Sequence, residues 1–304
     1  DSMSEERVLP ASFFVVQVPI ERTLNVALLS KMLRVEAPAG GLFSYTECRG
    51  EASVIVDEAA VNTVVEHVKQ MGQGSDPLVL PQVFRALPVH SGAGADTIFE
   101  SGVVSRLTAP LIAEGISLFY LSTVDVELIL VEERDLERAL ACLNQTPVSD
   151  LSSPRHDKGQ VTFAGRTLCL CELAHDHVVS ATHALITSAF LSGRHDFFSF
   201  TRVGDQISIW LEPDQVALFP ADALTTHGQW QLLQVDHVEP CGSVYSVSRL
   251  LSEASIPMMF MSTYSMDYAA VSTHPPRHSA HPKRVFADSS FQFTVNVSVV
   301  IARR

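Results

Sequence analysis

The sequence lacks the short motifs that mark most enzyme classes. No glycine-rich dinucleotide or phosphate-binding loop, no HExxH zinc pattern and no GxSxG nucleophile pattern occurs in its 304 residues. Without a phosphate-binding loop, a kinase within this chain is disfavoured. We therefore expect a protein that is not an enzyme and that carries no cofactor.

Long apolar runs and cysteine are also scarce. No apolar run approaches the roughly 18 residues that cross a bilayer, and the first residues, DSMSEER, lack the basic-then-apolar order of a signal peptide. The five cysteines are odd in number and irregularly spaced, which is typical of reduced thiols rather than of a disulfide framework. The net charge of −13 disfavours nucleic-acid partners and suits a cationic small ligand or a basic partner. These features predict a globular protein of the cytosol.

An internal repeat organises the chain. The segment 102–131 (GVVSRLTAPLIAEGISLFYLSTVDVELILV) aligns without a gap to 242–271 (GSVYSVSRLLSEASIPMMFMSTYSMDYAAV), with Glu127 opposite Asp267. In the other half of each repeat, FSYT at 43–46 matches FSFT at 198–201. The two matches occur in the same order, so the sequence predicts a duplicated pair of small units, A-B-A′-B′.

Hydrophobic periodicity gives every unit the order strand, helix, strand, strand, which a second helix extends in the first two. This is the ferredoxin-like βαββαβ plan of an α+β protein. The predicted elements are 12–18, 23–33, 42–46, 52–56 and 58–71 in A, and 83–89, 101–114, 117–121, 127–131 and 133–143 in B. In A′ they are 167–173, 177–191, 197–201 and 206–211, and in B′ 230–235, 243–255, 257–262 and 268–271.

Loop-forming stretches at 72–81 and 146–160 separate the units. We place the units at 8–78, 79–147, 161–226 and 227–272, with a linker at 148–160 and an atypical tail at 273–304. The fourth unit is incomplete, because Pro275, Pro276 and Pro282 prevent the expected last helix. Within the tail, 291–301 alternates like a strand without a counterpart in the first half.

Metal binding is disfavoured even where ligand residue types cluster. Cys169 and Cys171, followed by His175 and His177, lie in a predicted strand where both sulfurs face one side, most simply the core. Zinc sites instead prefer cysteines with two to four residues between them, in turns, whereas only Leu170 separates these two. The tail histidines 274, 278 and 281 lie among prolines without a supporting scaffold. We expect no metal.

The fourth unit holds the best candidate site. Gly242 and Ser243 open a predicted helix, whose free N–H groups and dipole favour an anion such as an amino-acid carboxylate. Asp267 follows a hairpin turn, where a carboxylate can hold a guanidinium. Each has a plain alternative, a turn glycine and a solvated hairpin residue. Together they offer one anion site and one cation site in a single unit.

These residues carry a family resemblance. The pattern of 102–131, continuing as Glu-Glu-Arg-Asp-Leu, resembles the second ACT unit of the CASTOR family of cytosolic arginine sensors, and Cys241-Gly242 with Ser262 to Asp267 resembles the fourth. The resemblance implies four tandem ACT units, arginine bound between the second and fourth, and a homodimer formed through the first and third. It also implies that the arginine-free protein inhibits a GATOR-type complex and so regulates TOR signalling.

The resemblance also implies ligand contacts from three segments. They are Ser117 and Leu118 on the second unit; His237, Glu239, Gly242, Ser243 and Val244 before and at the fourth-unit helix; and Thr263, Tyr264, Ser265, Met266 and Asp267 on the hairpin.

Two other hypotheses stay open. One is an ACT regulatory subunit of an amino-acid biosynthetic enzyme, whose catalytic part is a separate chain. The other is a ligand-independent partner-binding scaffold, because His237 stands where the family has glycine and Pro240 where it has an acidic residue.

Overall fold

The computed structural model describes ten segments of the chain: 8–19, 26–33, 40–48, 50–70, 76–89, 102–144, 161–191, 197–235, 242–273 and 299–300. Its elements follow the predicted order closely. In the first half these are β1 (Ser12–Pro19), α1 (Val26–Met32), β2 (Leu42–Cys48), β3 (Glu51–Asp57), α2 (Glu58–Gln70), β4 (Leu78–Val79), β5 (Phe84–Val89), α3 (Val103–Ala113), β6 (Leu118–Ser122), β7 (Glu127–Glu132), a 3₁₀ turn (Glu133–Asp135) and α4 (Leu136–Asn144).

The second half repeats much of this order. Its elements are β8 (Val161–Leu173), a 3₁₀ turn (His175–His177), α5 (Thr182–Ile186), a π-helical turn (Thr187–Leu191), β9 (Phe197–Val203), β10 (Gln206–Leu211), α6 (Pro213–Val216), β11 (Leu224–Val235), α7 (Ser243–Glu253), β12 (Met258–Ser262), β13 (Asp267–Ser272) and β14 (Val299–Val300).

The predicted helix 177–191 is the clearest error. The structure breaks it into a 3₁₀ turn, the short helix α5 and a π-helical turn. The hydroxyl of Ser180 donates to the His177 carbonyl and that of Thr182 to the Val178 carbonyl. Such bonds compete with the regular helical pattern, which the apolar spacing alone does not reveal.

Other differences concern the ends of strands. β8 begins at Val161 rather than 167, and β11 begins at Leu224 rather than 230, because the two strands pair with each other along most of their length. Part of the predicted linker 72–81 forms β4, which pairs with β1. Of the predicted strand 291–301, the structure describes Val299–Val300, which pairs in parallel with the start of β8.

The strands form one 14-stranded sheet. Thirteen of them follow the order β10-β9-β2-β3-β1-β5-β7-β6-β12-β13-β11-β8-β14, and β4 pairs with β1 off this path. β8 also pairs with β10, so the path closes on itself. Two pairings join the halves of the chain. β2 and β9 are antiparallel from Leu42↔Val203 to Cys48↔Phe197. β6 meets β12 at Leu121↔Met261.

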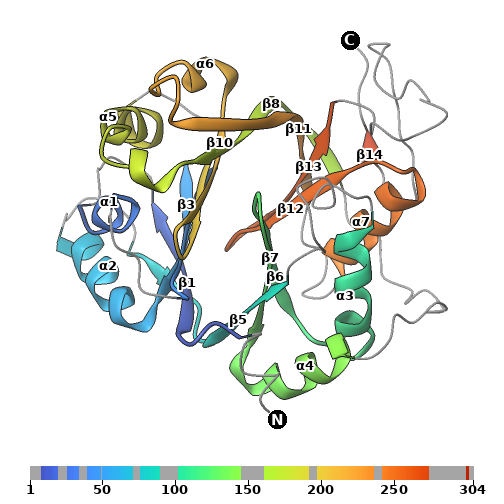
Figure 1. Ribbon diagram of the computed structural model, residues 1–304. Helices are drawn as coiled ribbons and strands as arrows, with labels where there is room; N and C mark the ends of the chain where they lie inside the picture. Colours follow the sequence, from blue (N-terminus) through green and yellow to red (C-terminus); the bar gives the residue numbers. More distant parts are fainter. Residues whose placement is uncertain are drawn as a thin grey trace.

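Helices cover the outer faces of this closed sheet (Figure 1). On one side, α1, α2, α5 and α6 cover β1–β3 and β8–β10, with a shared apolar core. On the other, α3, α4 and α7 cover β5–β7 and β11–β13 over a second core. Two smaller cores fill the space inside, one around Phe13, Phe84 and Leu128 and one around Trp210 and Trp230. Alternation along the strands therefore assigns each side chain to a helix-facing or an inner layer.

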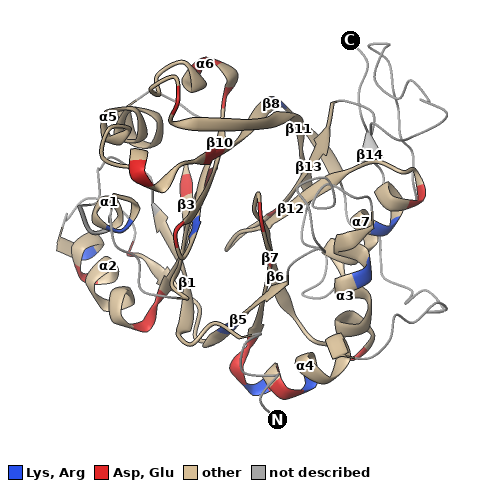
Figure 2. Cartoon of the chain, in the orientation of Figure 1, with Lys and Arg blue, Asp and Glu red and all other residues tan. Residues whose placement is uncertain are grey.

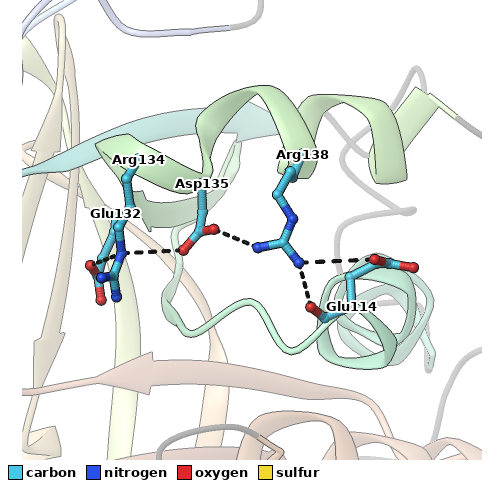
Figure 3. Close-up of polar contacts among 5 residues, drawn as sticks. All are labelled: Glu114, Glu132, Arg134, Asp135 and Arg138. Carbon is cyan, nitrogen blue, oxygen red and sulfur yellow. Dashed lines mark hydrogen bonds and ion pairs between the residues drawn. The ribbon is translucent and has the colours of Figure 1, made fainter.

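Among the described residues, charged positions lie mostly on helices and at strand ends, with Asp and Glu spread over both halves (Figure 2). A local network fixes α4 across the end of α3 (Figure 3). Arg138 donates to the Glu114 carbonyl at 2.6 Å and to Asp135 at 2.6 Å, and Arg134 pairs with Glu132 at 2.8 Å. Exposed pairs of this kind add little stability, but they hold the turn that leads from α3 into β6.

Candidate ligand-binding site

The site begins at the N-terminus of α7. Gly242 is its N-cap and has φ 119°, a conformation that side chains other than glycine rarely adopt. No side chain caps this end. The N–H groups in the first turn of a helix have no partner within the helix, and the dipole is positive there. An anion such as a carboxylate is therefore favoured at Ser243.

A buried carboxylate lies at the same helix end. Asp267 is the first residue of β13 and is only 1 % exposed. It alternates with the helix-facing Ala269 and Val271, which places it under α7. The hydroxyl of Ser243 donates to Asp267 Oδ2 at 2.8 Å. The sequence placed Asp267 after a hairpin turn, with a solvated hairpin residue as the alternative, and the structure places it at the start of β13 with almost no exposure.

Val244 contributes to this place in a different way. Its side chain is buried in the apolar core beneath α7. Only its backbone is therefore available to a ligand at the helix end.

The hairpin between β12 and β13 is closed by its own threonine. Thr263 Oγ1 accepts from Met266 N at 3.1 Å and donates to Met266 O at 2.6 Å. The tip of the hairpin faces β3: Tyr264 N donates to Ser53 Oγ at 2.9 Å and Ser265 Oγ to Glu51 at 3.1 Å. Of the predicted hairpin contacts, Asp267 thus lies at the helix end, while Tyr264 and Ser265 contact β3 in the first half of the chain.

Ser117 and Leu118 approach from the second unit. They follow α3 and start β6, and both are partly buried. α3 and α7 pack against each other. Each helix runs antiparallel to the strand after it, and β6 and β12 are themselves antiparallel, so the two helices are antiparallel. The C-terminal end of α3, where Ser117 lies, is therefore on the same side as Ser243. His237 and Glu239 lie outside the described residues.

A close approach of the helices fixes this arrangement. A Cβ atom on Gly102, the N-cap of α3, would lie 2.6 Å from Ser252 Oγ near the end of α7. Gly102 also has φ 94°. Both the backbone conformation and the packing therefore require glycine here.

Glu127 was not among the predicted site residues. This residue begins β7, is 1 % exposed and faces the α3 side of the sheet, as Asp267 faces α7. Burial raises the pKa of Glu127 to about 7, while the nearby hydroxyls of Ser122 and Tyr120 lower it in part. Even so, neither carboxylate oxygen has a hydrogen bond of acceptable geometry. The alignment of Glu127 with Asp267 was the available signal.

Tyr120 is the neighbour of Glu127 and is fully buried. Burial, and then the negative charge of Glu127, raise the pKa of Tyr120 well above its usual value, while the positive charge of Arg106 on α3 opposes the rise. Its ring packs edge-on against Phe260 at a centroid distance of 6.4 Å. Phe260 is the residue that the repeat aligns with Tyr120, so these two rings meet where β6 and β12 pair.

Serine hydroxyls join the two halves of the chain in equivalent pairs. Ser262 Oγ accepts from Tyr120 N at 3.1 Å, and Ser122 Oγ accepts from Phe260 N at 2.9 Å. Likewise Ser208 Oγ accepts from Val124 N at 3.0 Å, as Ser53 accepts from Tyr264. The contacts made by one half are repeated by the other.

Cys169 and Cys171 are both buried in the core beneath α5, as predicted from the strand pattern. Burial raises the pKa of the Cys171 thiol to about 11. A thiol with a raised pKa is a poor metal ligand and nucleophile. Within the described residues, no helix is both long and apolar enough to span a bilayer.

Comparison with known proteins bears on this arrangement. The ACT domain family matches residues 79–145, the segment from β4 to the end of α4. The "Cytosolic arginine sensor for mTORC1 subunit 1" of Pongo abelii is 25 % identical over 274 residues, covering 75 % of this chain and 81 % of the relative. The human protein of that name gives the same identity and coverage. The chain is a homologue of cytosolic arginine sensors. These relatives are named as sensors rather than enzymes.

Solved structures are more distant. Aspartate kinase from Synechocystis is 14 % identical, with a TM-score of 0.37 over 88 % of this chain and 52 % of that one. The ligand-free regulatory subunit of aspartate kinase from Thermus thermophilus is 13 % identical, with a TM-score of 0.34 over 44 % of this chain and 92 % of that one.

Proposed function

We propose that this protein is a cytosolic amino-acid sensor, most simply for arginine, that regulates TOR signalling through ligand-dependent binding to a GATOR-type complex. In this proposal it consists of four ACT-type units at 8–78, 79–147, 161–226 and 227–272, arranged as a duplicated pair. The homology with arginine sensors and the ACT domain match support the proposal. A homodimer through the first and third units is part of it.

One observation carries the ligand assignment. Ser243 donates to Asp267 at the start of α7, so an end that favours an anion and a buried carboxylate that favours a cation lie side by side. An amino acid with a basic side chain has both charges. Its carboxylate is expected at the first turn of α7 and its guanidinium at Asp267, with Ser117 and Leu118 approaching from the second unit.

The hairpin between β12 and β13 offers a way for ligand binding to change the binding of the GATOR-type complex. Tyr264 and Ser265 hydrogen-bond to Ser53 and Glu51 on β3, three residues or fewer from Asp267. A ligand that binds Asp267 and shifts it would therefore change the hydrogen bonds between the fourth unit and the first. Ligand binding shifts an equilibrium between two states only if it favours one of them. We expect arginine to favour the state that releases the GATOR-type complex.

The test is calorimetry with arginine and with citrulline, in which a neutral urea replaces the guanidinium. Charge-assisted hydrogen bonds contribute about 1.5–3 kcal/mol each, so Asp267→Asn should weaken arginine binding roughly ten- to a hundredfold. Citrulline should bind much more weakly than arginine. Exposed Glu137→Gln on α4 is the matched control and should leave the affinity unchanged.

Three results would redirect the proposal. Equal arginine affinity in wild type and Asp267→Asn would overturn the site assignment. If the wild-type protein binds no amino acid but still captures a GATOR-type complex, the ligand-independent scaffold is correct. If a catalytic subunit of an amino-acid biosynthetic enzyme co-purifies instead, the chain is its regulatory subunit.

A further inference from the structure

The elements that build the site at α7 occur a second time at α3. Gly102 is an N-cap with positive φ, like Gly242, and no side chain caps either helix end. Glu127 begins the strand beneath α3, as Asp267 begins the strand beneath α7. α3 has 11 residues, long enough for a full set of first-turn N–H groups.

The two places differ in how their carboxylates are satisfied. Asp267 accepts a hydrogen bond from Ser243. The position equivalent to Ser243 is Val103, which has no donor on its side chain. Among the described residues, no hydrogen bond of ordinary geometry reaches either oxygen of Glu127, although the hydroxyls of Ser122 and Tyr120 lie nearby, and the side chain is 1 % exposed. A buried carboxylate without a well-formed hydrogen bond is unfavourable, and an external cation would relieve this.

The residues around Glu127 also indicate what kind of ligand fits. Pro257 occupies the place of Ser117 and offers neither a hydroxyl nor an N–H, and Met258 occupies the place of Leu118. Both are buried. With Val103, the positions that the repeat makes equivalent to the Asp267 site are apolar, while the hydroxyls of Ser122 and Tyr120 lie beside Glu127 and the charge of Arg106 acts on Tyr120. Such a place suits a cationic head on an apolar stem rather than a ligand with many polar groups.

We propose that Glu127, at the N-terminal end of α3, forms a second binding site for a small organic cation, an amine or guanidine with an apolar stem. The site is separate from the one at Asp267, because α3 and α7 are antiparallel and their N-termini lie at opposite ends of the helix pair. An 11-residue helix is about 16 Å long, so one small ligand cannot occupy both ends. The proposal does not depend on arginine being the ligand at Asp267.

The probe is agmatine, a guanidine with a four-carbon stem and no carboxylate. Calorimetry on the full chain should show agmatine binding that survives Asp267→Asn and weakens at least tenfold in Glu127→Gln. 1-Pentanol, which has a similar stem and no charge, should bind neither variant. Arginine binding at Asp267 should be unchanged in Glu127→Gln, so the two proposals fail or succeed separately.

Hydrogen exchange on the wild-type protein gives a second readout that needs no variant. Agmatine should slow exchange of the backbone amides in the first turn of α3, at Val103 to Ser105, more than at the start of α7. Agmatine affinity that is equal in wild type and Glu127→Gln would overturn the proposal. So would protection confined to α7, because the cation would then occupy the Asp267 site alone.

Discussion

The buried carboxyl group of Glu127 makes the stability of the fold depend on pH in a direction that can be worked out. In the folded protein its pKa is raised from 4.5 to about 7, with burial as the largest cause. A group with a raised folded-state pKa holds its proton more tightly in the native state than in the unfolded state. The contribution of this tighter proton binding to the free energy of unfolding is fully present below the unfolded-state pKa. It is lost as the pH rises through the folded-state pKa.

The magnitude follows from the two pKa values. Each pH unit between them changes the free energy of unfolding by about 1.4 kcal/mol. Between pH 4.5 and about 7, the wild-type protein should therefore lose about 3 kcal/mol from this one group. Glu127→Gln keeps the shape of the side chain and cannot ionise, so the variant should not show this loss.

The assay is urea unfolding at pH 5 and at pH 8 for wild type, Glu127→Gln and the exposed control Glu137→Gln. The free energy of unfolding of Glu127→Gln minus that of the wild type should be about 2–3 kcal/mol larger at pH 8 than at pH 5. Glu47, whose pKa burial raises to about 6, contributes in the same direction but is present in every protein compared. If the difference between wild type and Glu127→Gln is the same at both pH values, Glu127 is not a buried, uncompensated carboxyl group.

The hairpins and the chain ends give three more expectations. Ser208→Ala removes the acceptor of the buried Val124 N–H, so it should lower the free energy of unfolding by about 1–3 kcal/mol. The control Ser265→Ala, at an exposed position, should change it by no more than about 0.5 kcal/mol. Equal effects of the two substitutions would contradict this. Truncation after Arg277 should lower Tm by no more than a few degrees, and a larger drop would show that the β14–β8 pairing supports the core. Light scattering should give a homodimer; a monomer at micromolar concentration would exclude it.

Much of the fold was predictable because the repeat and the strand alternation are strong signals. The segment 102–131 gave α3, β6 and β7 to within a few residues, since glycine, apolar spacing and the hairpin all agree there. The helix at 177–191 was mispredicted. The spacing of apolar residues there is helical, and it does not show that the hydroxyls of Ser180 and Thr182 hydrogen-bond to nearby backbone carbonyls. The early starts of β8 and β11 depend on their pairing with each other, which a local pattern does not contain.

The candidate site was predictable at one helix end and not beyond it. Gly242, Ser243 and Asp267 were singled out from helix-start and hairpin patterns, and the structure brings them together. The sequence assigned the hairpin tip and Asp267 to the same ligand site. Only the fold shows that Tyr264 contacts β3 instead. Glu127 was visible as the partner of Asp267 in the repeat, but its burial depends on α3 and β6 packing around it.

The two halves of the chain share some equivalent residues and differ in others. Which residues are shared depends on whether their hydrogen bonds are buried. Ser53 and Ser208, like Ser122 and Ser262, accept hydrogen bonds from backbone N–H groups buried between units. Loss of any of these serines leaves a buried donor without an acceptor, which is unfavourable in either half.

The helix ends have no such constraint. Their first-turn N–H groups can be satisfied by water or by a ligand, so Ser243 and Val103 can differ without disturbing the fold. Where the fold leaves that freedom, the two helix ends differ in chemistry: α7 begins with a hydroxyl beside Asp267, and α3 begins with the apolar Val103.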